Sequence, residues 1–391
     1  MLEGLLSLPT WGYITLTFIL TQITIAAVTI YLHRHQAHNA LELHPVISHF
    51  FRFWLWLTTG MNTREWVAVH RKHHAKCETP EDPHSPVVEG IGKILFGGVW
   101  FYHKAACVQD NLERYGKGTP NDLLQRTLYD PFPLLGILVM LAVDVLLFGW
   151  IGSIIWAVQI AWIPFWAAGV INGIGHYWGY RNYESPDASR NIFPFGLFIG
   201  GEELHNNHHG HASSARLSHK WYELDLGWMY IRALQFIGLA KVKKVAPRSE
   251  MRQDKQTIDL ETVRAVVRNR FHIMKLYARQ VILPTIREAS SGQSSQIQGL
   301  LRRARKLMSR EDLPMDAVAI ATIRQARLQS SNLDTVFEFK QQLKQLWQQS
   351  ATNHAKRLER LQAWCVDAEK SGISYLQEFA LSLRSYSLKT A

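Results

Sequence analysis

Residues 11–38 read WGYITLTFILTQITIAAVTIYL and then HRHQAH, so a run of 22 uncharged positions leads directly into a cluster of histidines. About 20 consecutive apolar residues span a bilayer as an α-helix, so residues 11–32 predict a membrane-spanning helix. Histidine is the commonest metal ligand in proteins, so HRHQAH predicts a metal site at the end of that helix. The fold class that we predict is therefore all-α, an integral membrane helical bundle.

Similar clusters occur twice more, as HRKHH at 70–74 and HNNHH at 205–209. At about 100° per residue, their i, i+3, i+4 spacing places the three histidines of each cluster on one side of a helix. His33 and His38 are five residues apart and diverge by about 140° on an ideal helix. That divergence predicts that they bind two different metals. A structural zinc closes with four ligands and usually recruits cysteine, so nine histidines suit two metals better than one zinc.

The apolar stretch 133–175 is interrupted at residues 149–152, GWIG, and predicts a hairpin of two more spans, about three in all. Segments 46–61 and 94–103 are shorter and suit interfacial helices. Cations follow the first span, so the positive-inside rule places the N-terminus outside and all three histidine clusters in the cytoplasm.

Charge divides the chain near residue 240. Residues 241–391 carry 27 Lys and Arg against 14 Asp and Glu, a net charge of +13, whereas residues 1–240 carry 16 against 18, a net charge of −2. We expect a membrane domain over 1–240 and a basic helical extension over 241–391, with helical patterns at 257–283, 297–309, 319–348 and 352–385.

The basic amphipathic run 300–307, LLRRARKL, is either a solvated helix face or a contact to anionic lipid headgroups. Electrostatics alone would equally permit nucleic acid. The last stretch, LQAWCVDAEKSGISYLQEFALSLRSY, is similar to the C-terminal helices of some bacterial transposases, but it brings no catalytic carboxylate set. We therefore expect no nucleic-acid partner.

The motifs HRHQAH, REWVAVHRKHHAKCETPEDPHSP and GGEELHNNHHGH together resemble the three histidine boxes of membrane fatty acyl desaturases of the stearoyl-desaturase superfamily. Residues 172–176, NGIGH, resemble the family's further Asn-x-x-x-His. The resemblance covers roughly residues 10–235 and is closest to bacterial delta-9 acyl-lipid and acyl-CoA desaturases. It implies a cytoplasmic di-iron cap on a multi-pass protein of the bacterial inner membrane, whose active site faces the cytoplasm. The implied catalytic and metal-binding residues are His33, His38, His70, His73, His74, Asn172, His176, His205, His208 and His209.

The resemblance also implies how two irons (Fe²⁺) divide these residues. One iron would take His33, His70, His73 and His208, with Asn172 contacting it through a water; the other would take His38, His74, His176, His205 and His209. Metal-bound imidazoles usually donate their second N–H to a carboxylate or carbonyl, so Asp82, Glu65, Glu202 and Glu203 are candidates to orient them. Candidates for the walls of an acyl tunnel, or else interface anchors, are Trp66, Trp156, Trp162, Trp166, Phe165 and Tyr177.

The implied reaction consumes O₂ and two electrons and places a cis double bond between the ninth and tenth carbons of a long saturated acyl chain. The chain would be carried by a phospholipid or CoA. The sequence contains no CxxC pair, GxGxxG turn or fused haem-cytochrome signature, so we expect an external ferredoxin-type or flavoprotein electron donor. Two alternatives stay open: a membrane di-iron hydroxylase or alkane monooxygenase, and a non-catalytic metal-binding or lipid-sensing membrane protein.

Overall fold

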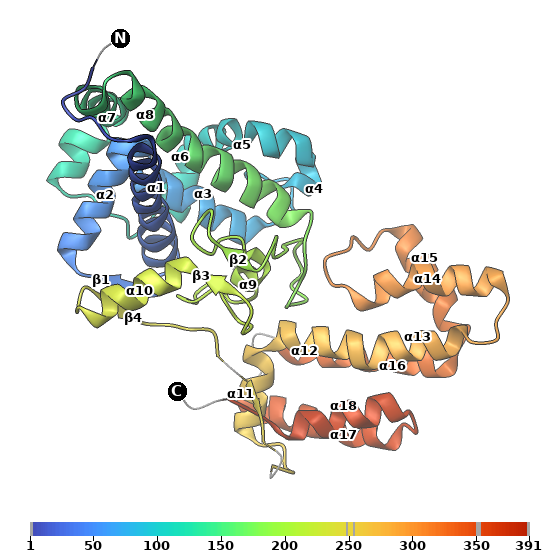
Figure 1. The fold of residues 1–391 in the computed structure, drawn as a ribbon. Coiled ribbons are helices and arrows are strands. Elements are labelled where there is room, and N and C mark those ends of the chain that lie inside the picture. The colour runs from blue at the N-terminus through green and yellow to red at the C-terminus, as the bar shows by residue number, and fades with distance from the viewer. Residues whose placement is uncertain (1–2, 248, 253–254, 349–352, 389–391) are drawn as a thin grey trace. The chain divides into compact units, whose positions relative to one another are not determined.

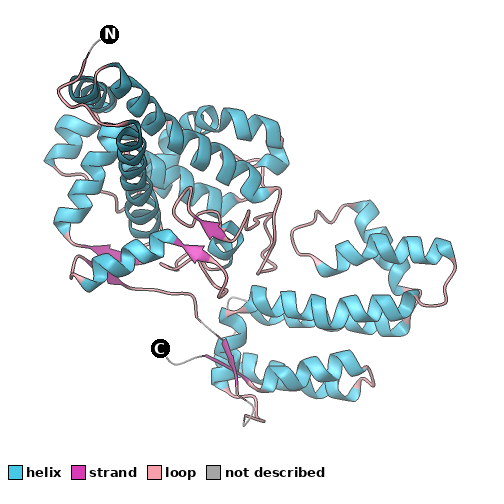
Figure 2. Cartoon of the chain, in the orientation of Figure 1, coloured by secondary structure: helices cyan, strands magenta, loops and turns pink. Residues whose placement is uncertain are grey.

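The structure is a computed structural model that describes residues 3–247, 249–252, 255–348 and 353–388. It is mostly helical, with short paired strands of two or three residues (Figures 1 and 2), in agreement with the predicted all-α class. The chain forms two compact units. The N-terminal unit comprises Met1–Arg181 and Asp187–Ala246, and the C-terminal unit comprises Asn182–Pro186 and Pro247–Ala391.

The N-terminal unit carries all three histidine clusters on helices. Its helical segments are α1 (Thr10–Ala26), the π-helix η1 (Ala27–Ala37), α2 (Pro45–Thr59), α3 (Thr63–Lys76), α4 (Pro86–Glu89), α5 (Ile91–Ala106), α6 (Gln109–Tyr115), η2 (Gln125–Tyr129), α7 (Pro133–Phe148), α8 (Trp150–Ile163), η3 (Pro164–Ile171), η4 (Ile174–His176), α9 (His205–Gly210) and α10 (Leu226–Phe236).

Two continuous helices, Thr10–Ala37 and Trp150–His176, are long and apolar enough to cross a membrane, and α7 is a shorter apolar helix. Their outer faces expose large apolar side chains: Trp11 is 71% exposed and Leu134 on α7 is 70% exposed. Contiguous exposed apolar surface is unfavourable in water, so these faces indicate membrane association. Gly149, with φ of +63°, forms the predicted turn between α7 and α8.

Local signals explain why α3 begins where it does. Gly60 adopts the left-handed conformation that ends α2, and the Asn62 side chain then accepts hydrogen bonds from the N–H groups of Arg64 and Glu65. A side-chain oxygen at this position satisfies the free N–H groups of a helix start. The turn therefore fixes the register of α3, and with it the direction of the second histidine cluster.

Arg34 connects the first cluster to the chain around the third. Its guanidinium is buried and donates to the carbonyls of Ala215 and Gly200 at 2.8 and 2.9 Å, and it pairs with both carboxylate oxygens of Asp225. Two strand pairs assist, β1 (Leu41–Leu43) antiparallel to β4 (Ala240–Val242) and β2 (Phe195–Gly196) parallel to β3 (Leu224–Asp225). Burying a charge is costly unless it is paired and hydrogen-bonded, and the two terminal amino groups of Arg34 meet this requirement through Asp225 and the two carbonyls.

The C-terminal unit is a helical bundle with an apolar core. Its segments are α11 (Leu260–Arg268), α12 (Arg270–Tyr277), η5 (Ala278–Ile282), α13 (Leu283–Ser290), α14 (Ser295–Ser309), α15 (Ala317–Arg327), α16 (Ser331–Gln348), α17 (His354–Lys370), α18 (Ser374–Arg384) and the antiparallel strands β5 (Ser249–Met251) and β6 (Tyr386–Leu388). The predicted helices 319–348 and 352–385 are each two helices, the second pair separated at Gly372, whose φ is +75°. Residue 352 lies outside the described residues.

Candidate metal centre

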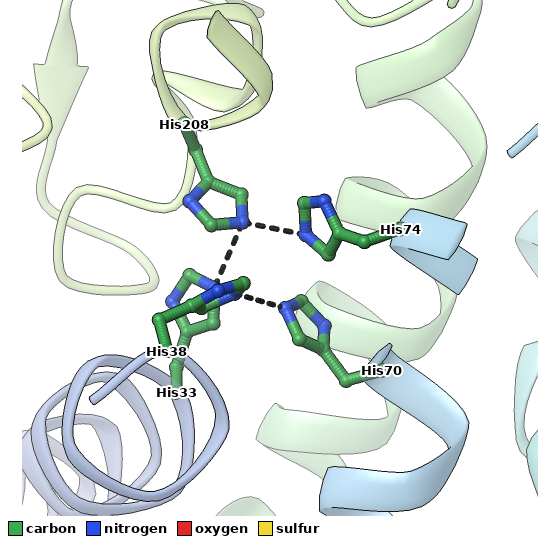
Figure 3. Close-up of side chains that lie close together, drawn as sticks. All are labelled: His33, His38, His70, His74 and His208. Atoms are coloured by element: carbon green, nitrogen blue, oxygen red, sulfur yellow. Dashed lines mark hydrogen bonds between the residues drawn. The ribbon is translucent and has the colours of Figure 1, made fainter. Parts of the chain in front are cut away.

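Five histidines from three separate segments converge in the N-terminal unit (Figure 3) and are called the first histidine group: His33, His38, His70, His74 and His208. Their candidate ligand atoms all lie within 4.8 Å of one another. The Nε2 atoms of His38 and His70 are 2.8 Å apart, and that of His208 lies 3.0 Å from His33 and 2.8 Å from His74. Ring nitrogens that face one another so closely could bind one metal ion between them.

Four more histidines adjoin the first group and are called the second histidine group: His73, His176, His205 and His209. The Nε2 atoms of His176 and His205 are 2.9 Å apart. The His176 ring lies 4.9 Å from that of His73 and 4.8 Å from that of His209, between centroids. The Cys77 thiol is 3.8 Å from Nε2 of His73. This second set of donors is distinct from the first, although the rings of His74 and His209 stack 4.4 Å apart.

His33 and His38 do not diverge as predicted for an ideal α-helix, because this segment is not α-helical. Residues 27–37 form a π-helix, and the N–H of His38 donates to the carbonyl of His33, five residues back. A π-helical bond closes one turn between residues i and i+5, so both side chains lie on the same side. Their ring centroids are 4.8 Å apart.

The two groups also divide the other clusters differently from the division that the resemblance implied. His38 and His74 join His33, whereas His73 joins His176, His205 and His209. On an α-helix, residues four apart diverge by about 40° but adjacent residues by about 100°. The first and last histidines of each H-x-x-H-H cluster therefore remain together, as His70 with His74 and His205 with His209. The middle histidine of each, His73 or His208, turns toward the other group.

Four buried or half-buried carboxylates bind the outer ring nitrogens. The Nδ1 atom of His33 lies 2.8 Å from Glu202, and that of His73 lies 2.9 Å from Asp82. The Nδ1 atom of His176 lies 2.9 Å from Glu78, and that of His209 lies 3.1 Å from Asp187. A carboxylate on Nδ1 fixes the tautomer and leaves Nε2 as the free ligand. Each of these four carboxylates therefore leaves the Nε2 atom of its histidine free to bind a metal ion within its histidine group.

Sequence reasoning found two of these carboxylates and missed two. Asp82 and Glu202 contact histidines as expected. Glu203 instead accepts backbone N–H groups of residues 198, 199 and 201, and burial raises its pKa to about 7. Among the described residues, Glu65 pairs with no histidine of either group.

The missed carboxylates lie in loops rather than in the histidine helices. Glu78 follows the end of α3 and has a φ of +61°, an uncommon conformation outside glycine, and Asp187 follows the chain segment that belongs to the C-terminal unit. No periodic pattern points to either residue. His84 was also missed: it is buried, stacks 4.5 Å from His73 and lines the adjacent cavity.

Burial keeps most of these imidazoles neutral. It lowers the pKa of His38, His70, His74, His205 and His208 well below its usual value and that of His209 to about 4. Burial acts in the same direction on His73, but Asp82 outweighs it and raises the pKa of His73. A metal ligand must be the neutral imidazole, so the site favours the form that binds metal.

A cavity of about 190 Å³ opens onto both groups. His33 and His70 of the first group and His205 of the second line it, together with Asn172. The rest of its wall is mainly apolar, from Val28, Met61, Val69, Val99, Ile163, Ala167, Ala168, Ile171 and Ile199 among others. Trp66 also lines it and stacks on His70, whereas Trp156, Phe165, Trp162, Trp166 and Tyr177 are not part of its lining.

Comparison with known proteins adds to this geometry. The profile of the fatty acid desaturase family matches residues 9–238, and a profile described as transposase matches residues 262–390. The chain is 30% identical over 250 residues to delta-9 acyl-lipid desaturase 1 of Arabidopsis thaliana, covering 62% of this chain and 79% of that protein. It is 31% identical over 246 residues to the sn-1 stearoyl-lipid 9-desaturase of Synechocystis (62% and 74%) and 30% identical over 249 residues to the icosanoyl-CoA 5-desaturase of Limnanthes douglasii (61% and 67%).

Proposed function

The chain belongs to the fatty acid desaturase family and is a fatty acyl desaturase, and we propose that it introduces a cis double bond between the ninth and tenth carbons of a long saturated acyl chain. The acyl group is carried by a phospholipid or by CoA. The names of its relatives support an acyl substrate on either carrier, since they include a stearoyl-lipid and an icosanoyl-CoA desaturase. Residues 1–240 form the catalytic membrane domain and residues 241–391 a basic helical extension.

The donor set fits two irons. The first histidine group would hold one iron and the second histidine group the other, with Asn172 near them at the cavity wall. Neutral imidazole is a suitable ligand for iron, and four of the nine rings are oriented by carboxylates. The single observation that carries the proposal is this convergence of nine histidines beside an apolar cavity. Two irons held there would supply the activation of O₂ that breaking an unactivated C–H bond requires.

The protein's own residues bind and position the acyl chain. The apolar cavity wall excludes water, so a methylene segment that enters it is desolvated, and His33, His70 and His205 place both groups beside that segment. Trp66 covers His70 by stacking at 4.9 Å and shapes the same wall. Positioning a flexible chain against a fixed reacting centre is the contribution that a rigid site makes to rate.

We further propose that the chain crosses the bacterial inner membrane three times, with α7 as the third span, and that the site faces the cytoplasm. Support comes from the apolar outer faces of α1 and α7 and from the cations that follow the first span. Electrons come from an external ferredoxin-type or flavoprotein donor, since the sequence contains no motif for a redox group of its own. O₂ is the second substrate.

The test is the fatty-acid profile of a desaturase-deficient host that expresses the chain, with double-bond positions mapped. We expect a new cis monoene from the native chain and none from His208→Ala, because His208 faces both His33 and His74. His35→Asn is the matched control: His35 is in the first box, but its Nδ1 contacts the Leu41 carbonyl and it belongs to neither group.

Iron and protein are measured in the same membranes. Hydroxylated chains in place of the monoene would instead establish the hydroxylase alternative. An unchanged lipid profile, with iron bound and an electron donor supplied, would contradict desaturation and support a non-catalytic lipid or metal sensor.

A further inference from the structure

Helix α14 of the C-terminal unit presents an uncompensated basic face. Its apolar side, with Leu301, Ala304 and Met308, is buried in the core of the unit. The opposite side exposes Arg302, Arg303, Arg305 and Lys306, and none of the four forms an ion pair with a described residue. Four like charges within five residues repel one another, so this face is complementary to an anionic surface.

Nearby acidic side chains do not neutralise this face. Glu311 pairs with Lys340 and Lys344, and Asp312 pairs with Arg310. Asp316 caps the start of α15 by accepting the N–H of Ala319. The acidic residues of the connection between α14 and α15 are therefore engaged elsewhere.

Helix α15 packs against α14 (Figure 1) and exposes large aliphatic side chains. Val318 is 74% exposed and Leu328, at its C-terminal end, is 78% exposed; Met315 and Ile320 are also more than half exposed. Exposed aliphatic groups beside a basic helix are typical of an interaction surface.

We propose that the α14–α15 hairpin docks on an anionic lipid bilayer surface, with the cations of α14 at headgroup phosphates and the aliphatic side chains of α15 in the acyl boundary. This proposal does not depend on the reaction proposed above. Amphipathic elements that bind bilayers combine these two kinds of side chain. This mode of binding differs from that of a single amphipathic helix. The apolar face of α14 is buried in the core of the C-terminal unit, so α15 supplies the side chains that contact lipid.

Single-stranded nucleic acid fits this surface less well than a bilayer does. Sequence-independent binding to single strands relies on aromatic side chains that stack on bases, and residues 295–328 contain no Phe, Tyr or Trp. Exposed Val318 and Leu328 would find little apolar surface on a phosphate backbone. The transposase match over 262–390 nevertheless makes DNA the competing occupant that the test must distinguish.

The test is amide hydrogen exchange of the full chain in nanodiscs of phosphatidylglycerol or of neutral phosphatidylcholine. We expect slower exchange across residues 295–328 in the anionic discs, and loss of that difference at high salt. Each cation near such a surface contributes about fivefold in partitioning. Replacing Arg302, Arg303, Arg305 and Lys306 together by Gln should therefore abolish the difference between the two lipids.

Arg264→Gln with Arg268→Gln is the matched control, since both lie exposed on α11 of the same unit. It should retain the lipid-dependent difference. Unchanged exchange in α17 and α18 shows that each variant is folded. Equal exchange of 295–328 in both lipids would overturn the proposal. Protection of the same residues by a DNA duplex added to detergent-solubilised protein, without protection by phosphatidylglycerol, would also overturn it and assign the surface to DNA.

Discussion

The N-terminal and C-terminal units bury different chemistry. The N-terminal unit encloses nine histidines with their carboxylates, whereas the C-terminal unit encloses an aliphatic and aromatic core with few charges, among them Lys340 paired to Glu311. A buried polar group must find a specific partner, but apolar cores tolerate many volume-conserving substitutions. The interior of the N-terminal unit therefore points to a specific chemistry, whereas the interior of the C-terminal unit accounts only for its fold and any interaction must be argued from its surface.

The largest expected effect comes from His38→Ala. Removing one ligand from the first histidine group should abolish desaturation and lower bound iron from two to about one per chain, since the second histidine group keeps all its members. Metal analysis of purified protein measures the loss. Retention of both irons would contradict the assignment of His38 as a ligand of the first histidine group.

The metal-free protein should lose stability in acid. Burial lowers the pKa of His209 from 6.5 to about 4, so between these values the unfolded chain binds a proton that the folded chain does not. Stability must then fall as pH drops from about 6.5 to about 4. His38, His70, His74, His205 and His208 act in the same direction, and His73, whose pKa is raised, opposes them.

Thermal unfolding of the metal-free protein in detergent, followed from pH 7.5 to pH 4.5, measures this effect. A melting temperature independent of pH in that window would mean that the histidines are not buried as neutral groups.

In the C-terminal unit, Leu301→Ala should lower the free energy of unfolding by about 2–5 kcal/mol, because Leu301 is fully buried in the core. Hydrogen exchange of α17 reports that change. The iron content should stay at the native value. Arg305→Ala, exposed on the same helix, is the control. Loss of iron from the Leu301 variant would show that the two units are not independent.

The smallest effect is expected from Asp82→Asn, which keeps the shape but removes the charge that His73 faces. Loss of such a partner typically weakens metal binding or activity by about 10–100-fold. Iron affinity measured by chelator competition should fall within that range. Glu65→Gln should leave it unchanged, and an equal loss from both variants would indicate general destabilisation.

Much of the fold follows from short-range patterns, but the details of the site do not. The helix at 11–32 and the Gly149 turn could be predicted from the sequence, because each depends on local composition. The π-helix at Ala27–Ala37 could not be predicted, because π-helices are rare and the same apolar run also fits an α-helix. In the C-terminal unit, the helical run continues from η5 through Pro284 into α13, so this proline does not end the helix.

The division of the ligands was partly available from spacing. His70 with His74 and His205 with His209 are each four residues apart, which pairs them on a helix, but only the structure shows that the middle histidine, His73 or His208, turns toward the other group. What spacing could not supply was the path of the loops that bring Glu78 to His176 and Asp187 to His209. Those contacts join residues 98 and 22 positions apart in the chain, a separation that no local pattern encodes.

The central claim is that the nine histidines form two iron sites with this division of ligands. Anomalous diffraction at the iron edge from iron-loaded crystals tests it directly. We predict two iron peaks, one bonded to His33, His38, His70, His74 and His208 and the other to His73, His176, His205 and His209. A single peak, or His33 and His38 bonded to different irons, would contradict the account.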